Sequence, residues 1–450
     1  MRRRLPAAAP GRARRRVGVS AVASRSVAAA LRSVTAADRV RDERAALETF
    51  AVDAIVPRWV ARPVSVDELA AVMTVAAEER LIVAPRGSGS ALDLGAPPAR
   101  LDLVVDLSGL DAIVEHNADD LTVTVQAGRS LHALNRYLLA HRQFLPLDPP
   151  GEAHTVGGTA AAGLSGPLRF RYGTMRDLLL GVRFVQADGV VTWGGSKVVK
   201  SVTGYDVPKL MVGALGTLGV LGELTLRLHS LPEAERTWLV AVPSAAAAQA
   251  LVASILDSTL QPNRIELNDH TLGAADAPLA VLVSFGSVME AVVEQGERLA
   301  RLARDAGGEA RAVSGEWTTA SDRVAGDRRT TLRVGSLPAR LRSTFETLRR
   351  ALGRIAGARS TLGAHTGLGL WRVTIDGATP EAIATAVAWL RDAVAEHGGY
   401  VVVTGGPVAV RRRVDPWGPI APDALALMRA IKTTFDPDAR LNPGRFVSGL

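Results

Sequence analysis

The 450-residue sequence contains no cysteine. Disulfide bonds and iron–sulfur clusters held by cysteine are therefore excluded within this chain. The sequence also lacks any run of about 18 uncharged apolar residues, the length that a membrane-spanning helix requires. Hydrophobic residues make up 47% and charged residues 22% of the chain, which is typical of a globular protein, and the length suffices for two or three domains.

Acidic residues are absent from the first 32 positions, which hold nine arginines. Without these nine charges, the formal net charge of +8 becomes −1 for the remaining 418 residues, so a basic face for nucleic acid is not required. We expect residues 1–45 to be a disordered, arginine-rich extension. Alternatively, the first residues result from a start codon upstream of the true one. A twin-arginine export signal is the alternative, but Arg25 interrupts its apolar stretch early.

Glycine is concentrated between Gly157 and Gly219, where 13 of 63 residues are glycine, against 43 of 450 overall. Glycine loses much backbone entropy on folding, so this density needs a reason. The apolar runs between the glycines, such as Leu178–Val185 and Val220–Leu228, predict short strands. The segment therefore forms either many tight turns or a backbone that closely approaches a flat, phosphorylated ligand.

An earlier segment, Leu81–Ser90, reads LIVAPRGSGS, an apolar strand followed by a Gly/Ser loop. Successive backbone amides in such a loop can bind an anion such as a pyrophosphate. The loop is no Walker loop, because no Gly-Lys-Ser/Thr follows. It is no dinucleotide fingerprint either, because Gly87 and Gly89 lack a glycine three residues on. Alone, such a loop is more often an ordinary turn.

Together, these segments resemble the FAD-binding domain of the vanillyl-alcohol oxidase/PCMH flavoprotein family, and most of all the glycolate oxidase FAD-binding subunit of the GlcE type. The resemblance covers residues 52–232 and, more weakly, the last forty residues. The matching pieces are PRGSGS (85–90), LPLDPP (145–150), TVGGTAA (155–161), RYGTMRDLLLG (171–181), GGSKVVKSVTGYD (194–206), GALGTLGV (213–220) and LNPGRF (441–446).

The resemblance implies FAD held by the backbone of these loops. Some family members bond the flavin to a histidine at the end of the first loop, where this chain has Ser90. Since no cysteine is available for the other known linkage, we expect FAD to be bound non-covalently. Ser201 and Ala214 replace residues with more hydrogen-bonding capacity. The residues expected at the cofactor are Pro85, Arg86, Gly87, Ser88, Gly89, Ser90, Thr155, Val156, Gly157, Gly158, Gly173, Thr174, Asp177, Gly216, Thr217, Leu218, Gly219, Val220 and Asn442, with Arg445 nearby.

The expected fold class is α+β, with a PCMH-type FAD-binding domain of two subdomains and an α/β cap domain that has an antiparallel sheet. Helices are predicted at residues 64–80, where Ser65 can cap the N-terminus, and at 131–140. Long Ala-rich helices alternate with strands after residue 233. We expect the FAD-binding domain at 46–232, the cap or substrate domain at 233–408, and a C-terminal segment, 409–450, that returns to the FAD-binding domain.

A candidate catalytic site lies in the piece AHTGLGLWR. The resemblance extends to D-lactate and glycolate dehydrogenases in which two histidines seven residues apart, with a distant acid, hold a metal and the 2-hydroxy acid. Here His365 matches the first histidine, but Arg372 replaces the second, and Thr404-Gly405-Gly406-Pro407 stands where a Gly-Glu-His piece is expected. We therefore expect no metal. Arg372 can bind a carboxylate with two hydrogen bonds, or it is a surface charge beside a turn histidine.

These features predict an FAD-dependent oxidoreductase acting on a 2-hydroxy acid such as glycolate or D-lactate, as the FAD-binding subunit of a glycolate oxidase-like complex. The alternative is a flavin-carrying electron-transfer or assembly subunit whose partner oxidises the substrate. The resemblance implies a second flavin subunit and an iron–sulfur subunit as partners. The expected location is cytoplasmic, with partners providing any contact with the inner membrane.

Overall fold

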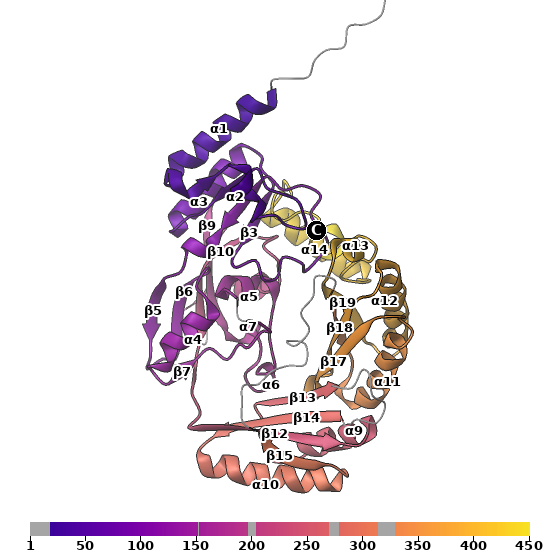
Figure 1. The fold of residues 1–450 in the computed structure, drawn as a ribbon. Coiled ribbons are helices and arrows are strands. Elements are labelled where there is room, and N and C mark those ends of the chain that lie inside the picture. Colours follow the sequence, from indigo (N-terminus) through magenta and orange to yellow (C-terminus); the bar gives the residue numbers. More distant parts are fainter. Residues whose placement is uncertain (1–18, 152, 197–203, 270–278, 314–328) are drawn as a thin grey trace, which may run out of the picture.

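The computed structural model describes residues 19–151, 153–196, 204–269, 279–313 and 329–450. They form three main sheets with their helices, which Figure 1 colours from indigo at the N-terminus to yellow at the C-terminus. Among these residues, we find no helix with the length and apolar character of a membrane span. Ser201, named above, falls outside them.

The first sheet has four strands in the order β1-β2-β4-β3, of which β2, β4 and β3 run parallel. Parallel strands need a crossover connection, and helix α3 (Val66–Glu78) supplies it between β2 and β3. Ser65 caps this helix as the sequence predicts, because its hydroxyl accepts a hydrogen bond from the Glu68 amide at 3.1 Å. The strands are β1 (Val40–Arg41), β2 (Trp59–Ala61), β3 (Val83–Arg86) and β4 (Leu103–Asp106).

Helix α1 (Val19–Val34) differs from the disordered extension expected over residues 1–45. Its residues Val27, Ala28 and Leu31 are buried in one hydrophobic cluster with the core of α3. The apolar residues after Arg25 lie on one helical face, so a helix forms where α3 can cover that face. The arginine-rich composition of the preceding residues concealed this pattern in the sequence.

The second sheet is antiparallel, in the order β5-β6-β10-β8-β9. Apolar side chains alternate along its strands, and those of Val125, Val182 and Leu224 are fully buried against the helices that follow β6. The elements are β5 (Ile113–Asn117), β6 (Thr122–Gln126), α4 (Leu131–Leu139), β7 (Gln143–Phe144), α5 (Val156–Ala162), α6 (Arg169–Tyr172), α7 (Met175–Leu178), β8 (Leu179–Val185), β9 (Val191–Gly195), α8 (Val207–Met211), β10 (Val220–Arg227) and β11 (His229–Ser230).

The third sheet has eight antiparallel strands in the order β15-β12-β14-β13-β17-β18-β16-β19, and we call residues 234–405 the cap. The cap consists of two βαββαβ units that meet where β13 pairs with β17. Four helices cover one face of the sheet (Figure 1). The elements are β12 (Ala234–Val242), α9 (Ala245–Leu256), β13 (Arg264–Asp269), β14 (Leu279–Ser287), α10 (Met289–Asp305), β15 (Glu309–Val313), β16 (Thr330–Gly335), α11 (Leu341–Leu352), β17 (Arg359–His365), β18 (Leu370–Asp376), α12 (Pro380–Ala395) and β19 (Tyr400–Gly405). These elements agree with the antiparallel cap sheet expected from the sequence.

The C-terminal segment returns to the first sheet after helices α13 (Val408–Arg411) and α14 (Pro422–Phe435). Val83 of β3 donates its amide to the Arg440 carbonyl at 2.8 Å and accepts from the Asn442 amide at 2.9 Å. Lys432 is buried on α14 and donates to the carbonyls of Thr217 and Leu441. The two ends of the chain thus build one body, in which the last residues border the glycine-rich loops.

Candidate functional site

A pocket lies where the loop after β3, helix α5, the loop before β10 and the C-terminal segment meet. We call it the glycine pocket, because six of the described residues that line it are glycines. The expected cofactor residues that line it are Pro85, Arg86, Gly87, Ser88, Gly89, Ser90, Gly157, Gly158, Gly216, Gly219 and Asn442, together with Arg445.

Glycine is required at two places in the wall of this pocket. A Cβ on Gly87 would lie 2.3 Å from the hydroxyl oxygen of Thr155, closer than real side chains approach. Gly216 has a φ of +66°, and its Cβ would lie 2.8 Å from a ring carbon of Pro85. These glycines let three loops converge around the cavity while leaving their backbone exposed to a ligand.

The glycine pocket suits a flat, phosphorylated ligand. Its walls consist largely of backbone and small side chains, and Arg86 adds a positive charge. The Arg86 guanidinium donates to the Thr49 carbonyl at 2.8 Å and lies 4.8 Å from the centre of the Phe50 ring, so its position is fixed. Burial lowers the pKa of Arg86 from its usual value. Backbone amides beside a fixed guanidinium are suited to bind phosphates, so these residues fit FAD.

Three expected cofactor residues are placed directly behind the pocket wall. Thr155 is the N-cap of α5, where its hydroxyl accepts from the Gly158 amide at 3.1 Å, and it also packs against Gly87. Val156 and Val220 are fully buried in the cores below the loops. These side chains support the pocket from outside, and their contacts to a cofactor stay a prediction.

Five other expected residues lie away from the glycine pocket. Thr217 and Leu218 border a separate hollow next to α14. Gly173, Thr174 and Asp177 form a capping box at α7, in which the Asp177 carboxylate accepts from the Thr174 amide at 2.7 Å. The positive φ of Gly173 turns the chain into this cap. The geometry assigns the last three residues a local structural role.

Ser90, at the position where some relatives attach flavin to histidine, is hydrogen-bonded to His154. The His154 Nε2 lies 2.7 Å from the Pro150 carbonyl, which can only accept, so Nε2 carries the proton. Nδ1 is then an acceptor, and the Ser90 hydroxyl donates to it at 2.9 Å. His154 therefore fixes the end of the first loop, a role that the sequence did not indicate.

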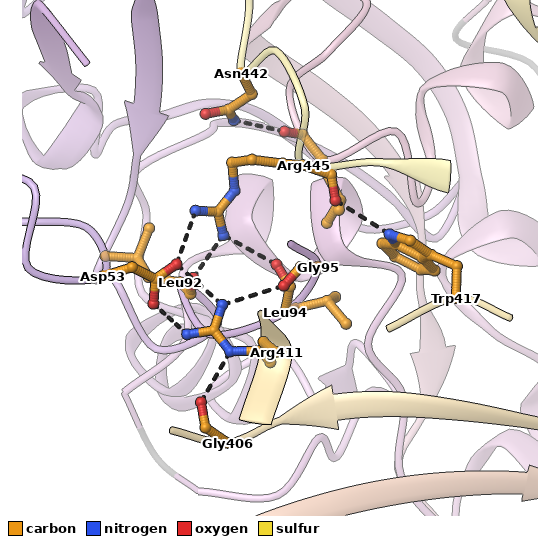
Figure 2. Close-up of polar contacts among 10 residues, drawn as sticks. Asp53, Leu92, Leu94, Gly95, Gly406, Arg411, Trp417, Asn442 and Arg445 are labelled. Carbon is orange, nitrogen blue, oxygen red and sulfur yellow. Dashed lines mark hydrogen bonds and ion pairs between the residues drawn. The ribbon is translucent and has the colours of Figure 1, made fainter. Parts of the chain in front are cut away.

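A buried group of charges closes one end of the glycine pocket. Figure 2 shows the guanidinium groups of Arg411 and Arg445 on either side of the Asp53 carboxylate. Arg445 also donates to the carbonyls of Leu92 and Leu94 in the loop that follows the first glycine loop. Burial lowers the pKa of Arg445, while Asp53 raises it. This cluster joins the N-terminal region, the end of the cap and the C-terminal segment at the cofactor loop.

A second pocket lies between α6 and the face of the cap sheet opposite α9–α12. We call it the arginine pocket, because Arg169, Arg333 and Arg372 all line it. Ala161 and Ala162 line the glycine pocket, and the next three residues of the chain, 163–165, line the arginine pocket. The two pockets therefore adjoin at the end of α5.

His365 and Glu266 form the chemical centre of the arginine pocket. Strands β17 and β13 pair so that these two residues are directly opposite, and the Nδ1 of His365 contacts the Glu266 carboxylate. Both side chains are largely buried, with 13% and 4% of their surface exposed. A carboxylate on one ring nitrogen fixes the orientation of the imidazole, so the other nitrogen can accept a proton from a ligand.

Arg372 lies on the same sheet face as His365, and both line the arginine pocket. Their catalytic roles stay a prediction. Within the described residues, no group of three His, Cys, Asp or Glu side chains is arranged to hold a metal ion. Glu266 and Arg333 were not among the expected site residues. Glu266 becomes recognisable as a partner of His365 only through the pairing of β13 with β17.

Asp148 joins the two halves of the molecule next to the arginine pocket. Its carboxylate accepts from the Leu168 amide at 3.0 Å and from the Arg264 guanidinium of β13 at 3.3 Å. Arg264 also contacts Glu235 of β12. Burial raises the pKa of Asp148 to about 6, although Arg264 and the Leu168 amide lower it. A titratable group thus lies at the boundary between the cap and the FAD-binding half.

Comparisons with known proteins agree with this arrangement. Residues 57–195 match the family model of an FAD binding domain, and residues 417–446 match the C-terminal domain of FAD linked oxidases. The glycolate oxidase subunit GlcD of Bacillus subtilis is 29% identical over 86% of this chain and 88% of its own length. The glycolate oxidase subunit GlcE of Escherichia coli is 38% identical over 33% of this chain and 43% of its own length.

Among solved structures, p-cresol methylhydroxylase with substrate bound superimposes with a TM-score of 0.74, covering 95% of this chain and 97% of its own, at 16% sequence identity. This likeness confirms the expected α+β fold with a PCMH-type FAD-binding domain and a cap. Most of the residues that line the glycine pocket lie within the two matched segments, whereas Val52 and those between 215 and 221 lie outside them. Residues 57–195 thus form an FAD binding domain, residues 417–446 match the C-terminal domain of FAD linked oxidases, and the whole chain shares the fold of p-cresol methylhydroxylase.

Proposed function

We propose that this protein oxidises a 2-hydroxy acid, such as glycolate or D-lactate, with FAD in the glycine pocket and the acid in the arginine pocket. The observation that carries the proposal is the buried Glu266–His365 pair, which lies with Arg372 in a cavity adjoining the glycine pocket. A base, its orienting carboxylate and a cation for the substrate carboxylate are the groups that this oxidation requires.

Each of these three side chains has a distinct role in the proposed reaction. Arg372 binds the carboxylate of the acid and fixes the hydroxyl-bearing carbon in position. His365 takes the hydroxyl proton, and Glu266 holds the imidazole in the tautomer that can do so. FAD, when bound, supplies the oxidant that accepts the two electrons of the C–H bond. Burial of the His365 and Glu266 side chains limits the access of water to the base.

We further propose that FAD is held without a covalent bond. Ser90 occupies the loop position where a linking histidine would stand, and the chain has no cysteine. Acid precipitation of the flavin-loaded protein should then leave all flavin in the supernatant. Flavin that stays with the precipitated chain would contradict a non-covalent site.

The second candidate function is that of a flavin-carrying electron-transfer or assembly subunit. It is favoured by Arg372 at the place of a second histidine and by the likeness to a subunit of glycolate oxidase. In that case a second flavin subunit oxidises the acid, and an iron–sulfur subunit takes the electrons. We propose a cytoplasmic complex of this kind, at the inner membrane only through its partners.

Substitution of His365 separates the two candidates. We expect H365Q to lower the rate of flavin reduction by a 2-hydroxy acid about 100-fold or more at equal FAD content, because the base is lost. The matched control is H397Q, at an exposed histidine beyond α12, which should reduce at the wild-type rate. If H365Q and R372A both leave substrate-driven reduction unchanged, catalysis at this site is wrong. A wild-type flavin that no 2-hydroxy acid reduces would favour the electron-transfer role instead.

A further inference from the structure

Two arginines of the arginine pocket, Arg169 and Arg333, are left after Arg372 is assigned to the first carboxylate of the substrate. Among the described residues that line the pocket, the carboxylate of Glu266 is already engaged with His365. Charges removed from water are costly unless they are paired, so the partly buried Arg169 and Arg333 indicate a negatively charged ligand.

Of the arginines that line the pocket, Arg333 is the one whose position a bound ligand would best explain. On the paired strands β16 and β18 it stands directly opposite Arg372. Like charges in such a cross-strand pair destabilise a sheet, because their Cβ atoms are only about 5 Å apart. The Nε of Arg333 is buried and has no hydrogen-bond partner within the described residues. Protein contacts therefore do not explain this arginine.

Arg169 approaches Arg333 from the FAD-binding half. It lies at the start of α6, and its guanidinium donates to the Ser165 hydroxyl at 2.9 Å. Its pKa is lowered first by burial and then by the positive charge of Arg333. The two guanidinium groups thus repel each other across the boundary between the cap and the FAD-binding half, and an anion between them would remove that repulsion.

Asn268 adds a neutral hydrogen-bonding group on the same wall. The residue is 2% exposed, it lines the pocket, and its side-chain oxygen has no hydrogen-bond partner among the residues described. Gly363, opposite Asn268 on β17 and next to Arg372 on β18, has no side chain to fill the space between them. The open space beside Gly363 and the side-chain oxygen of Asn268 therefore lie together on this sheet face.

We infer that the substrate carries a second anionic group, distant from the carboxylate beside its hydroxyl, and that Arg169 and Arg333 bind this group. This inference rests on the proposed function, in which Arg372 binds the first carboxylate. A carboxylate and a phosphate share the required chemistry, so the substrate is a 2-hydroxy dicarboxylate or a phosphorylated 2-hydroxy acid. Its oxidation yields the 2-oxo acid: the hydroxyl proton passes to His365, the C–H hydrogen leaves with both electrons to FAD, and the second anionic group is unchanged.

Binding of inert acids tests the second anion site without any reaction. Succinate and propionate differ by one carboxylate, and neither has a hydroxyl to oxidise. By titration calorimetry on the FAD-loaded protein, we expect succinate to bind at least tenfold more tightly than propionate, because it makes an additional charge-assisted contact. Equal affinities would overturn the inference.

Kinetics with matched substrates test the same site in the reaction. In anaerobic flavin reduction we expect kcat/KM for D-malate or D-3-phosphoglycerate to exceed that for D-lactate at least tenfold. The better of these two substrates shows whether the second anionic group is a carboxylate or a phosphate. R333Q should lower this ratio about tenfold, and R333K should retain most of it. The control R311Q, at an exposed arginine on the edge strand β15, should change neither the ratio nor the rate.

The outcomes separate this inference from the proposed function. Reduction by D-lactate without preference for a dianion would overturn the second anion site and uphold the 2-hydroxy acid oxidation. Tighter succinate binding that R333Q abolishes, in a protein that no 2-hydroxy acid reduces, would uphold the anion site and overturn the oxidation. If R333Q does not fold, the affinities of the wild-type protein for succinate and propionate still test whether the second anion site exists.

Discussion

Asp53 and Arg411 are 358 positions apart in the sequence and form a buried ion pair beside the glycine pocket. Arg411 stands just beyond the last cap strand and also donates to the Gly95 carbonyl at 3.1 Å, after the first glycine loop. Because Arg445 shares the same carboxylate, Asp53 balances two buried cations. The contact fixes the end of the cap and the C-terminal segment to the cofactor loop (Figure 2).

Removal of Asp53 should therefore destabilise the protein more than removal of Arg411. D53N removes the carboxylate that both buried guanidinium groups contact and leaves only Asp93 as a nearby negative charge, whereas R411M leaves Asp53 paired with Arg445. Breaking a buried ion pair costs about 3–5 kcal/mol, so we expect D53N to lower the melting temperature by several degrees and R411M by less.

An exposed ion pair provides the control for this comparison. Arg413 and Glu381 pair at the surface, where such contacts contribute little, so R413Q should melt within about one degree of wild type. Equal melting temperatures for D53N and R413Q would show that the buried cluster does not hold the two parts together.

Gly216 should be required for cofactor binding beyond its effect on stability. G216A places a methyl group 2.8 Å from Pro85 in the wall of the glycine pocket. The control is G398A, because Gly398 has a similar φ of +71° but open space around its Cβ. Both substitutions destabilise the fold by about 1 kcal/mol, because alanine disfavours a positive φ.

Only G216A should lose FAD affinity, by about tenfold or more, in a titration of the flavin-free protein followed by fluorescence. An equal loss of affinity in G398A would mean that the strain, and not the pocket wall, controls cofactor binding.

Asp148 should make stability depend on pH between about 4 and 6. Its pKa is raised from 3.8 to about 6 in the fold, mainly by burial, so the folded protein binds more protons than the unfolded chain in this range. The contribution of Asp148 to stability should fall as the pH rises from 4 to 6 and stay constant above about 7.

The variant D148N isolates this contribution, because its amide mimics the protonated carboxyl. The melting temperature of wild type minus that of D148N should decrease as the pH is raised from 4 to 7. An increase over that range would mean that the ion pair with Arg264 outweighs the cost of burial.

Glu266 and His365 should act as one unit in catalysis. E266Q removes the charge that orients the imidazole, so we expect flavin reduction to slow about 10- to 100-fold at equal FAD content. Because Glu266 works through His365, the double variant E266Q/H365Q should be no slower than H365Q alone. Multiplicative losses in the double variant would indicate separate roles for the two residues.

Local pattern in the sequence predicted much of the fold. The N-cap at Ser65 and the long helices of the cap lie where expected, because capping and apolar spacing are local properties. The sequence did not predict helix α1, since its apolar face is explained only by its packing against α3. The matched glycine loops also identified most of the glycine pocket.

The remaining site residues depend on contacts that no local pattern encodes. Glu266 meets His365 only through the pairing of β13 with β17, 99 positions apart, and Arg333 faces Arg372 only through the strand order of the cap. No motif around Asp53 in the sequence predicted its place in the buried charge cluster. Conversely, Asp177 carried a family motif but closes a capping box.

Anaerobic absorbance of the purified, FAD-loaded chain tests the central claim most directly. Addition of a 2-hydroxy acid from a panel containing glycolate, D-lactate, D-malate and D-3-phosphoglycerate should bleach the flavin absorbance in the wild type and not in H365Q. A flavin spectrum that none of these acids changes would contradict oxidation by this chain alone. A chain that takes up no FAD would contradict the assignment of the glycine pocket itself.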